Sequence, residues 1–367
     1  MTDNVKITFS TERIKYIVYE NIKNLVFENK GIVYGGFVRD YIISDHYKRI
    51  YNQTNSYSTS AFWNKLIHPE TAARTIVAND IDVCMYSEED VFKFIADLQN
   101  LFCLDAGFDN ITSSNIVVDS TMKYFGAPIT THRKINYKII VGKIPYVFCG
   151  VELSFNIDII IPKNMSNQPP FYKTDLLSNI FLMNKEGIVI SKNTGTIIDR
   201  MSLLDKQKIT HSIMKDIVEF KTQFAIRDKC YFDYNSGSFL YNCEVYNRIH
   251  KMMFRTFKWN ITNLPFEICD FQSNKATNNC CICLSNFKKK NKIVKIYIDN
   301  STKTEKVCSV AHDYCLFKYF ETQIEVGKHN KMNTTDEFEF RCPMRNIINF
   351  KLHSDNITQI INDKMKE

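Results

Sequence analysis

A glycine pair, Gly35-Gly36, is the feature that most constrains the fold of this chain. The apolar stretch Ile32-Val33-Tyr34 before it is typical of a short buried strand, and residues 37–44 after it have the pattern of a helix start. Because glycine has no side chain, such a turn lets phosphate groups approach the N–H groups at the N-terminus of the following helix. The order strand, Gly-Gly, helix therefore predicts a phosphate-binding turn.

A pair of aspartates follows in residues 79–83 (NDIDV), where a strand is predicted over residues 81–86. Side chains two residues apart on a strand point to the same face, so Asp80 and Asp82 lie on one side. Chemistry that uses two divalent ions about 3.5–4 Å apart needs such carboxylates, since Mg²⁺ prefers oxygen ligands. The pair therefore predicts a site for Mg²⁺ or Mn²⁺.

Asp158 is the candidate for a third carboxylate. It lies in residues 151–161 (VELSFNIDIII), where polar and apolar side chains alternate as in a half-buried strand. Glu152 shares the polar face but lies about 20 Å away at the rise of a strand, so both acids cannot reach one metal pair. Each element is common alone, whereas the glycine turn followed by the aspartate strand is much rarer.

The segments GGFVRD (35–40) and NDIDV (79–83) together resemble the DNA polymerase β-like nucleotidyltransferase superfamily. The form Gly-Gly-x-Val-Arg-Asp is most similar to its tRNA CCA-adding and bacterial poly(A) polymerase branch, over roughly residues 10–165. The resemblance implies that Asp80 and Asp82 hold Mg²⁺ and that Asp158 is the third acid. It also implies a nucleotide pocket formed by the glycine motif, namely Gly35, Gly36, Arg39 and Asp40.

The chain departs from that branch in two ways. The connection between the two motifs is much longer, and residues 48–75 are polar without periodicity, so we expect an inserted loop there. The later base-selecting motifs, an Arg-Arg-Asp segment and a Glu-Asp-x-x-Arg helix, have no match. These departures argue against CCA addition and leave general or oligo(A)-type tailing, or another acceptor, open.

Half of the twelve cysteines lie near the C-terminus. Two pairs there have the spacing of zinc knuckles, Cys280-x2-Cys283 and His312-x2-Cys315. Zn²⁺ takes four tetrahedral nitrogen or sulfur ligands, so these four residues predict a zinc site. Cys308 and Cys342 lie in the same segment.

The cysteine segment resembles a RING finger, through the stretches CCICL, HDYCLFKYF and Cys342-Pro343. In our preferred register the four ligands above complete the first zinc site. A degenerate second site then keeps Cys308 and Cys342, with Arg345 where the last cysteine belongs. In a shifted register, Lys318 instead stands where a ligand of the first site belongs, and each of the two zinc sites lacks one ligand. The resemblance implies docking of a ubiquitin-conjugating enzyme at Ile282, Tyr319 and Pro343; a structural zinc in an interaction module is the alternative.

The expected fold class is α+β, with a nucleotidyltransferase fold of a mixed sheet and flanking helices, a helical middle region and a small zinc module. The expected segments are a catalytic domain (1–170), a mainly helical domain (171–270), the RING-like module (271–350) and a tail (351–367). Net charge is +7, which is compatible with a phosphate-rich partner.

No signal pattern or membrane-length apolar stretch is present, so we expect a cytoplasmic protein with no membrane contact. The AT-rich character of the composition and the fused architecture suggest a virus-infected cell as its setting. The expected function is template-independent transfer of NMP from NTP to an acceptor hydroxyl, an RNA 3′ end. The alternative is a RING-like ubiquitin ligase or adaptor that contacts a protein partner on an inactive nucleotidyltransferase scaffold.

Overall fold

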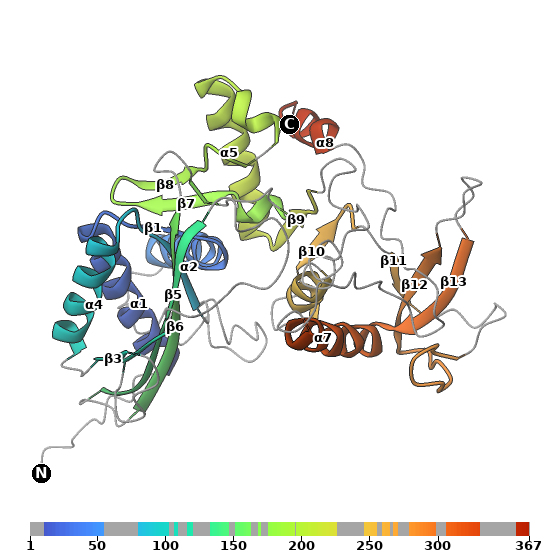
Figure 1. Ribbon diagram of the computed structural model, residues 1–367. Helices are drawn as coiled ribbons and strands as arrows, with labels where there is room; N and C mark the ends of the chain where they lie inside the picture. Colours follow the sequence, from blue (N-terminus) through green and yellow to red (C-terminus); the bar gives the residue numbers. More distant parts are fainter. Residues whose placement is uncertain are drawn as a thin grey trace, which may run out of the picture. The chain divides into compact units, whose positions relative to one another are not determined.

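The structure is a computed structural model (Figure 1). It describes residues 11–54, 80–102, 106–108, 116–119, 133–146, 151–162, 168–169, 175–194, 196–225, 246–254, 259–264, 267–270, 279–298, 306–330 and 357–366. The chain forms two compact units. The first comprises Met1–Lys123, Thr130–Thr174 and Ser178–Glu219, and the second comprises Tyr124–Ile129, Asp175–Leu177 and Phe220–Glu367.

An eight-stranded sheet forms the centre of the first unit among its described residues, in the order β3-β4-β5-β6-β2-β1-β7-β8. The pairs β2–β6 and β3–β4 are parallel and the other pairs are antiparallel, so the sheet is mixed. The predicted α+β class with a mixed sheet is confirmed. The strands are β1 (Ile32–Tyr34), β2 (Asp80–Cys84), β3 (Ala106–Phe108), β4 (Ile116–Asp119), β5 (Arg133–Tyr146), β6 (Val151–Pro162), β7 (Phe181–Asn184) and β8 (Gly187–Ile190).

Among the described residues, four helices accompany this sheet, and their boundaries follow the capping and apolar pattern of the sequence. They are α1 (Thr11–Glu28), α2 (Gly36–Thr54), α4 (Glu88–Phe102) and α5 (Leu203–Val218). The start of α4 is capped by Ser87, whose Oγ accepts a hydrogen bond from the Asp90 N–H at 3.1 Å. Its apolar face buries Phe94 and Leu98 completely. Helix α1 packs against α4 and β1, while α2 packs on β1, β2, β7 and α5.

The prediction of a mainly helical segment over 171–270 is wrong where β7 and β8 extend the sheet of the first unit. The turn between them was missed: Asn184 Oδ1 accepts hydrogen bonds from Glu186 N (2.9 Å) and Gly187 N (3.1 Å). The predicted inserted loop at 48–75 begins later than expected, because α2 continues to Thr54. The rest of that loop lies outside the described residues.

The second unit contains two small sheets and further helices. Strands β9 (Lys221–Gln223) and β10 (Asn260–Thr262) pair in parallel, and β11 (Glu267–Asp270), β12 (Lys292–Ile298) and β13 (Lys306–His312) form an antiparallel sheet. Helix α7 (Asp313–Asn330) follows β13 directly, residues 246–254 are helical, and the predicted tail contains α8 (Ile357–Lys364). Tyr246 and Phe320 are fully buried in an edge-to-face contact of 4.9 Å. None of the described helices has both the length and the apolar character of a membrane span.

Candidate functional site

The aspartates of the first unit lie on two neighbouring parallel strands. Strand β2 pairs with β6 in a register that sets Asp80 opposite Asn156 and Asp82 opposite Asp158. Register partners on adjacent strands project to the same face of a sheet, so the three carboxylates share one face. The alternate residues Ile81, Val83 and Ile157 are completely buried on the other face. Tight apolar packing on that side therefore fixes the register that brings the acids side by side.

The glycine turn lies directly against this acidic face. Gly35 has φ = 75°, a left-handed conformation that side chains rarely adopt. A Cβ atom at Gly35 would collide with Oδ2 of Asp82. A Cβ at Gly36 would only reach ordinary contact with Arg39 Nη2, at 3.5 Å. Sequence reasoning assigned both glycines to phosphate approach; at Gly35 the neighbouring carboxylate gives a second reason for glycine.

Arg39 and Asp40 form a fixed pair at the start of α2. Arg39 Nε lies 3.0 Å from Asp40 Oδ1, and both side chains are largely buried. Arg39 Nη1 also donates a hydrogen bond to Oδ1 of Asn179 at 3.3 Å. Asn179 ends a three-residue 3-10 helix, η2 (Leu177–Asn179), and is 140 positions from Arg39. No local sequence pattern marks Asn179, so only the fold could find it.

Tyr19 on α1 is a second residue that sequence reasoning missed. Burial raises the pKa of its phenol well above the ordinary value, and the charge of Asp80 raises it further. Tyr19 is thus a neutral hydroxyl close to Asp80. Its ring contacts Phe37 edge-to-face at 5.7 Å. In the sequence it is indistinguishable from the other apolar positions of α1, which explains why it was not found.

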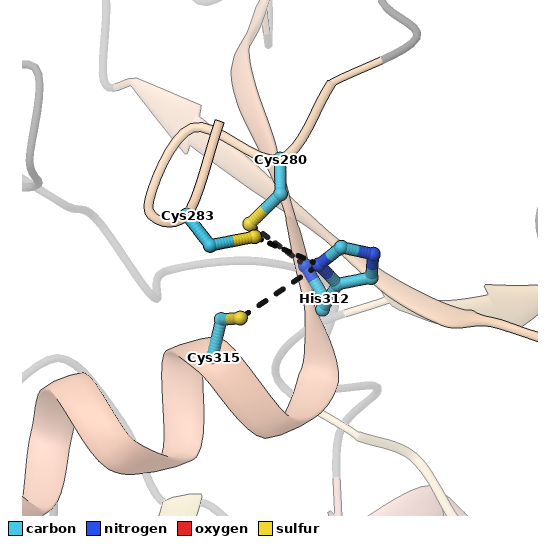
Figure 2. Close-up of side chains that lie close together, drawn as sticks. All are labelled: Cys280, Cys283, His312 and Cys315. Atoms are coloured by element: carbon cyan, nitrogen blue, oxygen red, sulfur yellow. Dashed lines mark hydrogen bonds between the residues drawn. The ribbon is translucent and has the colours of Figure 1, made fainter. Parts of the chain in front are cut away.

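The predicted zinc ligands of the second unit converge on one point, as Figure 2 shows. Cys280 and Cys283 come from a turn closed by the bridge between Asn279 and Asn286, His312 from the end of β13, and Cys315 from the first turn of α7. Their ligand atoms all lie within 4.8 Å of one another. The four predicted ligands are thus brought together, and the group could hold a zinc ion.

Two distances support a tetrahedral site. Sγ of Cys283 and Sγ of Cys315 lie 3.5 Å and 3.7 Å from Nδ1 of His312. With Zn–S about 2.3 Å and Zn–N about 2.0–2.1 Å, the sulfur–nitrogen edge of a tetrahedron is about 3.6 Å. The distances from these two sulfur atoms to His312 therefore match that edge.

Hydrogen bonds and ring packing hold the ligands in place. Cys280 Sγ accepts from the backbone N–H groups of Ile282 and His312, both at 3.4 Å. Phe287 packs its ring edge-to-face on His312 at 4.7 Å. N–H groups directed at sulfur stabilise a thiolate, the form that binds metal.

The thiols next to one another have opposite pKa shifts. Burial raises the pKa of the Cys315 thiol to about 12, and the charges of Cys280 and Cys283 add to this. A backbone hydrogen bond from Ser285 lowers the pKa of the Cys283 thiol to about 6. Thiolates packed this closely repel one another, so they ionise together only when a cation neutralises them. The cluster therefore has the chemistry of a metal site.

The second RING-like zinc site stays a prediction. Cys342 and Pro343 lie outside the described residues, as does the side chain of Cys308 on β13. Lys318, the missing ligand of the shifted register, is exposed and forms an ion pair with Glu321 at 2.8 Å. The preferred register is the one that brings four ligands together.

The cysteine–histidine group is the sole cluster of three or more metal-ligand atoms this close together in the part of the chain that the structure describes. The aspartates of β2 and β6 form no such group. In a two-metal centre the carboxylates are divided between ions about 3.5–4 Å apart. Their oxygen atoms therefore need not lie as close together as the four ligand atoms of one zinc ion. The roles of Asp80, Asp82 and Asp158 as metal ligands stay a prediction.

Comparisons of this chain with models of known protein families, with curated proteins and with solved structures found no match.

Proposed function

We propose that this protein is a divalent-metal-dependent nucleotidyltransferase that transfers NMP from NTP to an acceptor hydroxyl, the 3′ end of an RNA. The observation that carries the proposal is the register of β2 and β6. It sets Asp82 beside Asp158 while Gly35 packs on the Asp82 carboxylate. An acidic strand pair and a side-chain-free turn are thus adjacent, which is what metal-assisted transfer of a phosphate-bearing group needs.

Each residue has a distinct role under this proposal. Asp80 and Asp82 would hold two divalent ions, and Asp158 would be a ligand of the ion that activates the acceptor hydroxyl. When bound, the ions supply a lowered pKa for that hydroxyl and neutralise charge on the leaving pyrophosphate. The acceptor hydroxyl releases its proton to solvent, its oxygen forms a bond to the α-phosphorus, and the bond from that phosphorus to the pyrophosphate oxygen breaks.

The glycine turn and its neighbours position the triphosphate. Gly35 and Gly36 leave room for phosphate oxygens at the first N–H groups of α2, where the helix dipole favours negative charge. Arg39 is held in one orientation by Asp40 and Asn179, so its guanidinium requires little reordering on binding. Tyr19 stays uncharged beside Asp80 and adds no repulsion to an incoming phosphate.

A direct experiment is to incubate the full-length protein with labelled NTPs, Mg²⁺ or Mn²⁺ and short RNAs. We expect labelled, extended RNA, and no extension by Asp80→Ala with Asp82→Ala. Glu89→Ala with Glu186→Ala is the matched control, because these exposed carboxylates lie elsewhere in the first unit. Absence of incorporation into RNA, tRNA and protein acceptors would refute the proposal.

A second candidate function, a protein-interaction module, is favoured by the zinc group. Leu284 in the knuckle and Tyr314 in the first turn of α7 are 73% and 58% exposed, and both lie on segments that supply the cysteine and histidine ligands, so a protein partner can reach them. If the finger is a ubiquitin ligase, the protein will stimulate ubiquitin transfer from a conjugating enzyme, and Ile282→Ala will abolish it. If zinc is structural only, no transfer will occur and the metal content will still be about one zinc per chain.

A further inference from the structure

A cavity of about 930 Å³ lies within the first unit, between α1, α2, the β7–β8 hairpin and α5. None of the three aspartates or the two glycines of the proposed catalytic site lines it. Its volume is within the range of about 300–1,000 Å³ that ligand sites have. The cavity is therefore large enough for a ligand and separate from the acidic face.

The walls of the cavity combine apolar and aromatic side chains. Tyr41 lines it from α2, about one and a half helical turns after Gly36, and its ring also contacts Phe37 at 6.3 Å and the ammonium of Lys23 at 4.7 Å. The apolar lining comes from Phe27, Ile42, Met183, Ile188, Met214 and Val218. Such a lining accepts the flat face of a base, since stacking on an aromatic ring is worth about 1–3 kcal/mol per base.

Positive charge outweighs negative charge in the lining. Four side chains are lysine or arginine and two are acidic, and His46 and His211 add two imidazoles. Two of the cations are already paired: Lys23 lies 2.7 Å from Glu20, and Arg49 lies 2.6 Å from Asp45. The remaining cations decide what the cavity attracts.

Lys185, His211 and Lys215 form no ion pair with another residue that the structure describes. Lys185 lies in the turn of the β7–β8 hairpin, and the other two are four residues apart on α5, so they share one side of that helix. Basic groups thus reach the cavity from two elements. Their arrangement around an apolar lining fits phosphates on the outside and bases within.

We infer that this cavity binds a single-stranded segment of the acceptor RNA, with phosphates on Lys185, His211 and Lys215 and a base against Tyr41. The inference rests on the proposed function, because it takes its RNA from there. Charge complementarity and an aromatic wall together favour a nucleic acid strand over an apolar ligand. The cavity shares α2 with the glycine turn, so both belong to one helix.

The test measures binding without turnover, by fluorescence anisotropy of labelled ten-nucleotide oligo(A) and oligo(U). The full-length protein carries Asp80→Ala and Asp82→Ala throughout. Adding Lys185→Glu with Lys215→Glu will weaken binding at least about tenfold and reduce the slope of log K against log salt by about 1.4, as expected for two lost phosphate contacts. Lys93→Glu with Lys192→Glu changes the charge equally at exposed positions outside the cavity and will alter affinity less than about twofold.

A second variant tests stacking. Tyr41→Leu will weaken binding at least about fivefold, and Tyr41→Phe, which keeps the ring, will restore it. Equal loss in the control lysine pair, no loss in the cavity pair, or displacement of the RNA by equimolar ATP would each overturn the inference. RNA binding that depends on the cavity in a protein that incorporates no nucleotide would refute the proposed function alone. Incorporation by a protein whose cavity variants bind RNA normally would refute the inference alone.

Discussion

Replacing Gly35 with alanine should destabilise the protein for two separable reasons. Alanine at a positive φ costs about 1–2 kcal/mol, and the new Cβ would collide with Oδ2 of Asp82, which adds about 1–3 kcal/mol of overpacking. Gly187 provides the matched control: its φ is 128°, and no atom lies within 4 Å of a Cβ built there. We therefore expect a loss of about 2–5 kcal/mol for Gly35→Ala and about 1–2 kcal/mol for Gly187→Ala.

A double-mutant cycle isolates the contact between the turn and the aspartate. The free energy of unfolding is measured in urea for the wild type, Gly35→Ala, Asp82→Ala and the double variant. Because removing the carboxylate removes the collision, the double variant should recover about 1–3 kcal/mol relative to the sum of the single changes. Gly187→Ala should be additive with Asp82→Ala. If Gly35→Ala is also additive, or destabilises no more than Gly187→Ala, the glycine turn does not lie against Asp82 and the reasoning fails.

Further predictions concern the cysteine–histidine group, the hydrogen bond between Arg39 and Asn179, and the buried side chain of Tyr19. Cys283→Ser should reduce zinc from about one ion per chain to about none by plasma emission analysis, whereas Cys281→Ser, adjacent in the same knuckle, should retain it. Asn179→Ala should raise the KM for NTP about threefold to tenfold, as expected for one lost hydrogen bond to Arg39, and Asn179→Asp should restore it. The pKa of Tyr19 is higher in the folded state than in the unfolded state. The contribution of Tyr19 to the free energy of unfolding is therefore complete below the ordinary pKa of about 10 and is lost as the pH rises above it. From pH 9 to 11 the free energy of unfolding should therefore fall less steeply in Tyr19→Phe than in the wild type. An equal fall in the two proteins would contradict the raised pKa of Tyr19.

The zinc ligands could be predicted because their chemistry is local. Cys280 and Cys283 are three positions apart in one turn, and His312 and Cys315 span a strand end and the following helix. The spacing alone predicts each pair of ligands. Because a tetrahedral zinc ion needs four ligands, both pairs are expected at one ion. The alternation along β6 is also a local pattern, and it places both Asp158 and Glu152 on the polar face; the pairing of β2 with β6 sets Asp158 opposite Asp82.

The anchoring partners could not be predicted, since they depend on long-range pairing. Asn179 reaches Arg39 only because β7 pairs with β1. Nothing in the segment around Asn179 predicts that its side chain accepts a hydrogen bond from Arg39. The β7–β8 hairpin itself was mistaken for helix, because its turn depends on the Asn184 side chain and a positive φ at Gly187. The cavity between α1, α2, the β7–β8 hairpin and α5 likewise combines four elements that are distant in sequence.

Divalent metal binding at the acidic face can be measured without turnover. Mn²⁺ can be titrated into the zinc-loaded, full-length protein with a non-hydrolysable NTP analogue, and free Mn²⁺ followed by electron paramagnetic resonance. We expect about two Mn²⁺ ions per chain, as in two-metal sites generally, with both bound more weakly in Asp82→Asn and at least one bound more weakly in Asp158→Asn. Mn²⁺ binding that is absent, or that is unchanged when Asp80, Asp82 and Asp158 are replaced, would contradict this expectation.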